Sequence, residues 1–271
     1  MPGHRESDEG DFMILQGRTI SRGKASGEVL KLEEPLSFLG GVDGATGDLR
    51  VEKEGNVAGR ILVFPRGKGS TVGSFVMYDL MVHGNAPAAV INTSAETIVA
   101  TGAVISSIPM IDSVDVDLIH DGDHVTIDAD DGTVEIDGVT MIECASSVLM
   151  IGDRFVMLHR PSTSRSYPGR WSLVSGKMEA GESPVDTARR EILEETGIAV
   201  GDASGSIEAL IVREGDIIWK VHPFIFTVPE GMVPRINSEN TEYRLCSIDD
   251  LDGMELVPLT KDAVIRLIGM I

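Results

Sequence analysis

Cysteine is almost absent from this chain, whose 271 residues include only Cys144 and Cys246. Two thiols cannot build the disulfide framework of a small secreted protein. They also cannot hold an iron–sulfur cluster unaided, because such clusters normally need three or four thiolate ligands. We therefore predict a cytoplasmic protein from a reducing compartment that holds no cluster of its own.

Basic charge is scarce as well, with 23 lysines and arginines against 43 acidic residues and a net charge of −20. A nucleic-acid-binding protein needs a basic footprint, and an anionic membrane surface repels such a chain. No apolar run reaches the length of a membrane span, and residues 1–11 are too polar for a signal peptide. We expect neither nucleic acid nor a membrane as a partner.

Aromatic residues make up only 4% of the chain, but apolar residues reach 42%, which lets aliphatic side chains build two cores. We predict a flexible tail at residues 1–13, a β-rich α/β domain at 14–140 and a second α/β domain at 141–271. In the first domain we expect strands at 27–32, 48–52, 60–64, 88–92, 103–108, 124–127 and 133–136, and helices at 74–83 and 95–101. In the second we expect strands at 147–151, 154–159, 171–174, 206–212, 217–228 and 242–247, and helices at 184–196 and 259–268.

The most informative segment covers residues 176–198 and reads GKMEAGESPVDTARREILEETGI. Ser183 is a good helix N-cap, Pro184 suits the first turn, and Gly197 is a typical C-terminal stop. The spacing of the helix places three carboxylates on one face, those of Glu191, Glu194 and Glu195.

Neighbouring carboxylates repel one another, at roughly 0.2–0.5 kcal/mol per helical pair. A bound divalent cation removes that cost, and hard oxygen ligands suit Mg²⁺ or Mn²⁺, which also bridge phosphate oxygens. Arg190 lies beside Glu191 in the sequence and one turn before Glu194, so it can orient a carboxylate. Taken alone, the three glutamates would favour a solvated acidic helix.

The whole segment changes that weighing, because it matches the Nudix box, G-x5-E-x7-R-E-U-x-E-E-x-G-U with U aliphatic, at every fixed position. The C-terminal half resembles the Nudix hydrolase family. The resemblance implies an α/β/α sandwich that hydrolyses a nucleoside diphosphate linked to another group, or another diphosphate. The implied catalytic residues are Glu191, Glu195 and Arg190. The implied ligands of Mg²⁺ or Mn²⁺ are Glu191, Glu194, Glu195, Glu182 and the carbonyl of Gly176.

The substrate of this half stays open. Many Nudix members read Pro-Gly-Gly where this chain reads VSG at residues 174–176, so the substrate class does not transfer. Residues 222–224 and 239–243 are candidate pocket features, and they could equally be ordinary strand and loop residues.

A second informative segment, FPRGKGSTVGS at residues 64–74, lies between an expected strand and an expected helix. Small residues let backbone N–H groups approach a ligand, and a helix N-terminus favours negative charge. Such a loop is a candidate anion or phosphate cradle that could lower the pKa of a serine hydroxyl. A plain glycine loop explains it equally well. The candidate residues are Arg66, Lys68, Gly69, Ser70, Thr71 and Ser74.

Further segments occur in the same order in one known family. They are GKASGE at 23–28, PLSFLGGVD at 35–43, APAAVIN at 86–92, TGA at 101–103 and IP at 108–109. Over about residues 14–137 the chain resembles the small subunit of the aconitase X family, in particular that of archaeal phosphomevalonate dehydratases. The resemblance implies a swivelling β/β/α domain that closes over a site on a large-subunit partner.

The same resemblance implies a division of labour between two chains. Ser70 would remove a proton from carbon, and a [4Fe–4S] cluster on the large subunit would act on the leaving hydroxyl. The implied reaction converts a phosphorylated small molecule, (R)-5-phosphomevalonate, to trans-anhydromevalonate 5-phosphate and water. Gly41 and Asp43 form a second candidate binding turn, which could equally be structural.

Two alternatives remain open from the sequence. The first domain could dehydrate another hydroxy acid, of the hydroxyproline type. One of the two halves could also be only a binding or regulatory module.

Overall fold

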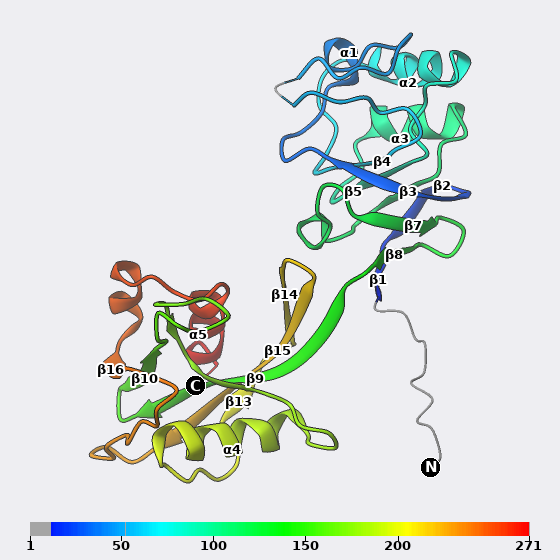
Figure 1. The fold of residues 1–271 in the computed structure, drawn as a ribbon. Coiled ribbons are helices and arrows are strands. Elements are labelled where there is room, and N and C mark those ends of the chain that lie inside the picture. Colours follow the sequence, from blue (N-terminus) through cyan, green and yellow to red (C-terminus); the bar gives the residue numbers. More distant parts are fainter. Residues whose placement is uncertain (1–11, 52, 271) are drawn as a thin grey trace, which may run out of the picture. The chain divides into compact units, whose positions relative to one another are not determined.

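The computed structural model describes residues 12–51 and 53–270. The chain divides into two compact units, Met1–Thr140 and Met141–Ile271 (Figure 1). No helix in the described ranges is long and apolar enough to cross a membrane. Each unit is built on its own sheet.

The first unit contains, among the described residues, an eight-stranded sheet in the order β1-β8-β7-β3-β4-β5-β6-β2. Strands β3 to β6 pair in parallel, and the remaining strands pair antiparallel at the two sides. The strands are β1 (Phe12–Gln16), β2 (Arg18–Ser21), β3 (Lys24–Lys31), β4 (Ile61–Phe64), β5 (Ala89–Asn92), β6 (Met110–Asp112), β7 (His124–Asp128) and β8 (Thr133–Asp137). The helices are α1 (Phe38–Gly41), α2 (Gly73–Val82), α3 (Thr97–Ile105) and the 3₁₀ turn η1 (Val116–Leu118).

Strands β4 and β5 are buried at every position, as expected of parallel strands covered on both faces. The helices α2 and α3 pack closely against each other, because a Cβ on Gly102 would lie only 2.4 Å from the sulfur of Met77. Leu62, Phe64 and Val90 fill the core beneath these helices. The sheet and the helix pair thereby fix the loop that leaves β4.

Three predictions for this unit are wrong. Residues 103–108 do not form a strand; residues 103–105 belong to α3, because Val99 and Ala103 bury one face of a helix against the core. Of the strand expected at residues 48–52, the described residues 48–51 contribute only isolated bridges, at Asp48 and Leu49, and residue 52 lies outside the described residues. Residues 12 and 13, assigned to a tail, pair with residues 136–137 in β1 and β8. The rest of the expected tail, residues 1–11, lies outside the described residues.

The second unit places a helix on each face of its sheet (Figure 1). Its strands are β9 (Thr140–Ile151), β10 (Arg154–His159), β11 (Trp171–Ser172), β12 (Val174–Lys177), β13 (Gly205–Ser206), β14 (Leu210–Glu214), β15 (Ile217–Val228) and β16 (Glu242–Cys246). Its helices are α4 (Pro184–Thr196), the 3₁₀ helix η2 (Ile248–Gly253) and α5 (Thr260–Ile268).

The alternation of side chains along β9 explains the two cores of this unit. Leu149 packs with Ile192 of α4, and Val148 packs with Leu267 of α5, because successive strand residues point to opposite faces. This arrangement confirms the predicted α/β class and the α/β/α layering. The single strand expected at residues 206–212 is divided into β13 and β14.

Candidate active sites

Helix α4 begins and ends where its terminal residues dictate. The Ser183 hydroxyl accepts a hydrogen bond from the backbone N–H of Asp186 at 3.3 Å, and Pro184 occupies the first turn. Gly197 ends the helix at φ +68°, a left-handed conformation that favours glycine. The predicted helix and its two boundaries are confirmed.

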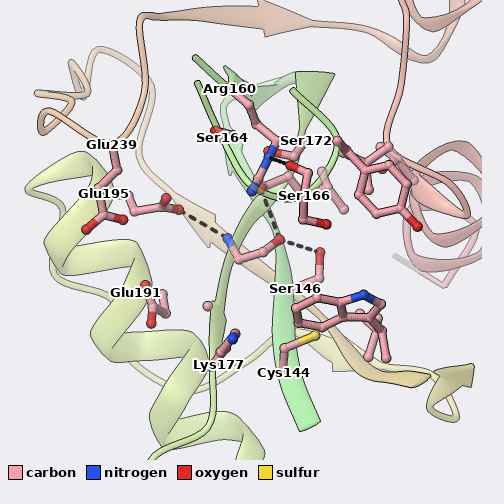
Figure 2. A pocket seen from close by; sticks show the side chains of 18 of the residues that line it. Cys144, Ser146, Arg160, Ser164, Ser166, Ser172, Lys177, Glu191, Glu195 and Glu239 are labelled. Atoms are coloured by element: carbon pink, nitrogen blue, oxygen red, sulfur yellow. Dashed lines mark hydrogen bonds between the residues drawn. The ribbon is translucent and has the colours of Figure 1, made fainter. Parts of the chain in front are cut away.

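The carboxylates of α4 lie beside a cavity of about 960 Å³. Glu191, Glu194 and Glu195 all line it, together with Gly176 and Glu239. Figure 2 shows Glu191, Glu195 and Glu239 on one side of this cavity. Two of the three box glutamates are buried, with Glu191 9% and Glu195 6% exposed, whereas the side chain of Glu194 is 54% exposed.

Burial is the main electrostatic influence on the two inner glutamates. It raises the pKa of Glu191, and it raises the pKa of Glu195 to about 7, with the negative charge of Glu239 acting in the same direction. Glu195 is held in place by the amide of Asn240 at 3.0 Å and the backbone N–H of Ser175 at 3.1 Å. Two buried carboxylates that face the same cavity are destabilised unless a cation compensates them.

Arg190 binds three glutamates of the box, Glu182, Glu191 and Glu194. Its guanidinium donates to Glu182 at 2.8 and 3.0 Å, to Glu191 at 2.6 Å and to Glu194 at 3.2 Å. The hydrogen bonds from Arg190, with one from Thr187, lower the pKa of Glu182 to about 2. In this structure Glu182 binds Arg190 and does not line the cavity. Its role as a metal ligand therefore stays a prediction.

Only part of the wider pocket prediction corresponds to the cavity. Within residues 239–243, Glu239 and Asn240 line it. Within residues 222–224, His222 instead contacts Glu143 at 2.7 Å and does not line the cavity. Asn240 lies 45 residues from Glu195 in sequence, so no local pattern could have paired them.

The glycine loop of the first unit leaves β4 and leads into α2. Its backbone is pinned to the segment before α1: the N–H of Lys68 donates to the carbonyl of Leu36 at 2.9 Å, and the N–H of Leu36 donates to the carbonyl of Arg66 at 3.1 Å. Gly69 has φ +102°, and a Cβ there would lie 2.6 Å from the hydroxyl of Ser37. The loop shape therefore requires glycine at this position.

The predicted residues of this loop divide by exposure. Arg66, Lys68, Gly69, Ser70 and Thr71 are exposed, whereas Ser74 is buried. The hydroxyl of the exposed Ser70 accepts a long hydrogen bond from the N–H of Val72, at 3.4 Å. Ser74 donates to the carbonyl of Thr71 at 2.9 Å, which supports the first turn of α2.

Gly41 and Asp43 have partners inside their own turn. The backbone N–H groups of Ala45 and Thr46 donate to Asp43 at 2.9 and 3.0 Å, and the guanidinium of Arg50 pairs with it. These backbone hydrogen bonds, with the charge of Arg50, lower the pKa of Asp43. The carbonyl of Gly41 accepts from the N–H of Arg50 at 2.8 Å. These contacts describe a structural turn, and the binding role stays a prediction.

The first unit has close relatives among known proteins. Residues 14–136 match the family model of the aconitase X swivel domain. The phosphomevalonate dehydratase small subunit of Thermococcus kodakarensis is 58% identical over 128 residues, which cover 46% of this chain and 96% of that protein. The protein of the same name from Methanosarcina acetivorans is 49% identical, covering 45% and 90%.

This chain belongs to the aconitase X family. Its second unit, over residues 143–267, matches the family model of the NUDIX domain and is a Nudix domain. A chain in the crystal structure of Thermococcus kodakaraensis aconitase X (holo-form) is 56% identical, with a TM-score of 0.45 and coverage of 46% and 98%. The MutT protein of Methanosarcina mazei Go1 is 27% identical, with a TM-score of 0.40 and coverage of 47% and 93%.

Nudix domains act with a divalent metal ion, and the box residues of this domain suit one. A Cβ on Gly176 would lie 1.8 Å from the carboxylate of Glu191, so glycine leaves room for that carboxylate beside the backbone of β12. The donors are carboxylate and carbonyl oxygens, which Mg²⁺ prefers. In the described part of the chain no group of three or more His, Cys, Asp or Glu side chains is placed to hold a metal ion; Arg190 instead forms ion pairs with Glu182, Glu191 and Glu194.

The swivel domain also contains polar atoms that no motif indicated. The side-chain oxygen of Asn92 and one carboxylate oxygen of Glu96 are buried and have no hydrogen-bond partner. Asn92 is the last residue of β5, and Glu96, which follows the strand, lies beside Gly67 of the glycine loop. Their positions at the carboxyl end of a parallel strand could have been anticipated from the general location of binding sites in such sheets.

Proposed function

We propose that residues 14–140 form the small subunit of a dehydratase that converts (R)-5-phosphomevalonate to trans-anhydromevalonate 5-phosphate and water. The observation that carries the proposal is the 58% identity to the phosphomevalonate dehydratase small subunit of Thermococcus kodakarensis, over 96% of the length of that protein. The reaction breaks a C–H bond and the C–O bond of the neighbouring hydroxyl, and a carbon–carbon double bond forms.

In this proposal Ser70 takes the proton from carbon. Its exposure on a loop that is hydrogen-bonded to the segment before α1 supports the role, because the hydroxyl must reach a substrate held on another chain. Arg66 and Lys68, exposed on the same loop, would offer two cations to the phosphate and the carboxylate of the substrate. Gly69, Thr71 and Ser74 would shape the bend that presents these groups.

We infer that a [4Fe–4S] cluster would be held by the large-subunit partner, where it would supply Lewis-acid chemistry for the loss of the hydroxyl. Both cysteines of this chain are buried and lie beyond residue 140. Burial raises the pKa of Cys144 to about 11, which opposes the thiolate form that binds iron. The protein would therefore work in a complex with a cysteine-rich subunit.

We further propose that residues 141–271 form a diphosphate hydrolase dependent on Mg²⁺ or Mn²⁺. Glu191, Glu194 and Glu195, with the carbonyl of Gly176, would hold the metal, which supplies charge neutralisation and a more acidic water. Arg190 would set the direction of the Glu191 carboxylate, and Glu182 would hold Arg190. Glu191 or Glu195 would accept the proton of the attacking water.

The dehydratase is tested by expressing the full chain with a cysteine-rich dehydratase large subunit and measuring conversion of 5-phosphomevalonate by mass spectrometry. Ser70→Ala should lower turnover by at least about a hundredfold, as expected of lost general-base chemistry. The exposed serine of β3 gives a matched control, Ser26→Ala, which should retain full activity. Equal turnover in both variants would exclude Ser70 as the base.

The hydrolase is tested by phosphate and nucleotide release from isopentenyl diphosphate, ADP-ribose and dinucleotides in the presence of Mg²⁺. The double variant Glu194→Gln with Glu195→Gln should abolish release, and Glu208→Gln, at an exposed position of the same domain, should not. A fused domain raises the effective concentration of a shared intermediate, so an isoprenoid diphosphate is one candidate substrate. Absence of isopentenyl diphosphate turnover would exclude an isoprenoid diphosphate as the substrate.

A further inference from the structure

One carboxylate joins two separate parts of the Nudix cavity wall. The Oε2 atom of Glu214 accepts a hydrogen bond from the hydroxyl of Ser166 at 2.8 Å and from the indole N–H of Trp219 at 3.3 Å. Ser166 lies in the segment between β10 and β11, and Trp219 lies on β15; both line the cavity. In Figure 2, Ser166 and Arg160 lie away from the glutamates of the box.

The hairpin holds the Glu214 carboxylate in position. Glu214 is the last residue of β14 and pairs with Ile217, the first residue of β15. The intervening Gly215 has φ +61°, a conformation that favours glycine at a tight turn. The Nε of Arg213 also donates to the carbonyl of Gly215 at 2.8 Å. The tip of the hairpin is therefore a rigid support for the carboxylate.

A continuous series of contacts connects this carboxylate to the box. The carbonyl of Lys177 accepts from Arg190 at 3.0 Å, and the Lys177 ammonium lies 5.4 Å from the centroid of the Trp219 ring. Trp219 then donates to Glu214, which binds Ser166. The indole is thus held between the metal-binding side of the cavity and the segment that covers its other side.

The segment at residues 160–170 is held by a hydrogen bond within itself and by one to Glu214. Nε of Arg160 donates to the carbonyl of Ser166 at 3.0 Å, which closes the segment on itself. The next residue, Tyr167, also lines the cavity and has φ +46°. The hydrogen bond from Ser166 to Glu214 ties this closed segment to the hairpin.

We propose that Glu214 is a positioning residue of the Nudix domain. It fixes Trp219 and the segment 160–170 as the wall that receives the group attached to the diphosphate. Glu214 therefore affects substrate binding, whereas cleavage of the diphosphate depends on the glutamates of the box. This inference rests on the proposed hydrolase function.

The first test needs no substrate and uses limited trypsin digestion of the full chain. Arg165 is exposed within the segment, whereas the Arg160–Pro161 bond resists trypsin, so cleavage before Ser166 reports on the segment. Glu214→Ala should speed this cleavage at least about fivefold, and Ser166→Ala should have the same effect. The double variant should be cleaved no faster than either single variant, because both substitutions remove the same hydrogen bond. Asp216→Asn, at the same hairpin turn, should leave the rate unchanged.

The second test separates binding from chemistry, with whichever of ADP-ribose, diadenosine polyphosphate or isopentenyl diphosphate the wild type hydrolyses. Glu214→Ala should raise KM about tenfold, as expected for a lost charge-assisted hydrogen bond, with kcat within twofold. Glu214→Gln, which keeps one acceptor oxygen, should restore part of the binding. Asp216→Asn should match the wild type.

The two tests separate the failure of this role from the failure of the proposed function. Unchanged proteolysis in Glu214→Ala, or a loss confined to kcat, would overturn the positioning role while the hydrolase stands. Absence of turnover of any of the three probes by the wild type would overturn the hydrolase proposal and this role with it.

Discussion

Replacing Gly176 with alanine tests the geometry of the Nudix box directly. A Cβ at this position would lie 1.8 Å from both Cδ and Oε1 of Glu191, whereas ordinary contacts begin at 3.4 Å. The backbone of β12 is held by pairing with β9, at Ala145, so the carboxylate has to move. The displaced group is 9% exposed and ion-paired with Arg190, so it cannot simply turn into solvent.

The size of the effect follows from the displacement. Misplacing a catalytic group by about 1 Å costs on the order of a hundredfold in rate. We expect Gly176→Ala to lower Mg²⁺-dependent turnover by at least about a hundredfold and to weaken Mg²⁺ binding in calorimetry. Overpacking should lower the free energy of unfolding of the domain by about 1–3 kcal/mol, which leaves it folded.

Gly201 supplies the matched control, because a Cβ there meets nothing within 4 Å and its φ is not in the left-handed region. Gly201→Ala should keep full turnover and full Mg²⁺ binding. Circular dichroism and thermal melting of both variants would show that each is folded. Turnover of Gly176→Ala within threefold of the wild type would refute the claim that this glycine makes room for Glu191.

Three further predictions concern stability and thiol chemistry. Arg18 donates to the buried Asp112 at 2.7 and 2.9 Å, so Asp112→Asn should lower the free energy of unfolding by about 2 kcal/mol in urea denaturation. The same hydrogen bonds lower the pKa of Asp112. The stability that Asp112 contributes is therefore full above its unfolded-state pKa and is lost as the pH falls through its folded-state pKa. A wild type that stays more stable than Asp112→Asn below both pKa values would contradict this explanation. Ser183→Ala removes the N-cap of α4 and should cost about 1 kcal/mol in the same assay, with no change expected only if the cap is unformed. Cys144 and Cys246 are buried, so a thiol reagent should label them far more slowly in the native protein than in urea, and rapid native labelling would disprove their burial.

Helix α4 illustrates what local sequence predicts well. Its N-cap, its first-turn proline and its terminal glycine act within a few residues of one another, so the predicted boundaries at residues 184 and 196 match the structure. The relative placement of the box glutamates on this helix was equally predictable from its period of 3.6 residues. Both features depend on contacts between near neighbours in the chain.

The segment at residues 103–108 illustrates the opposite case. A short apolar run suits a buried strand or a buried helix equally, and periodicity alone cannot separate them. The close approach of Gly102 to Met77 of α2 favours the helix, since it packs the chain through residue 105 as α3. That contact joins residues too distant in sequence for any local pattern to record.

By itself the sequence determined the two families, the box carboxylates, the exposed-loop serine and the lack of cysteines for a cluster, because these are properties of residue type and local spacing. Only the tertiary structure decided which groups meet. Asn240 holds Glu195 across 45 residues, and Ser166 binds Glu214 across 48. Such pairs arise because strand register and helix packing bring distant segments together, and the buried carboxylates acquire their raised pKa values only when that packing removes them from water.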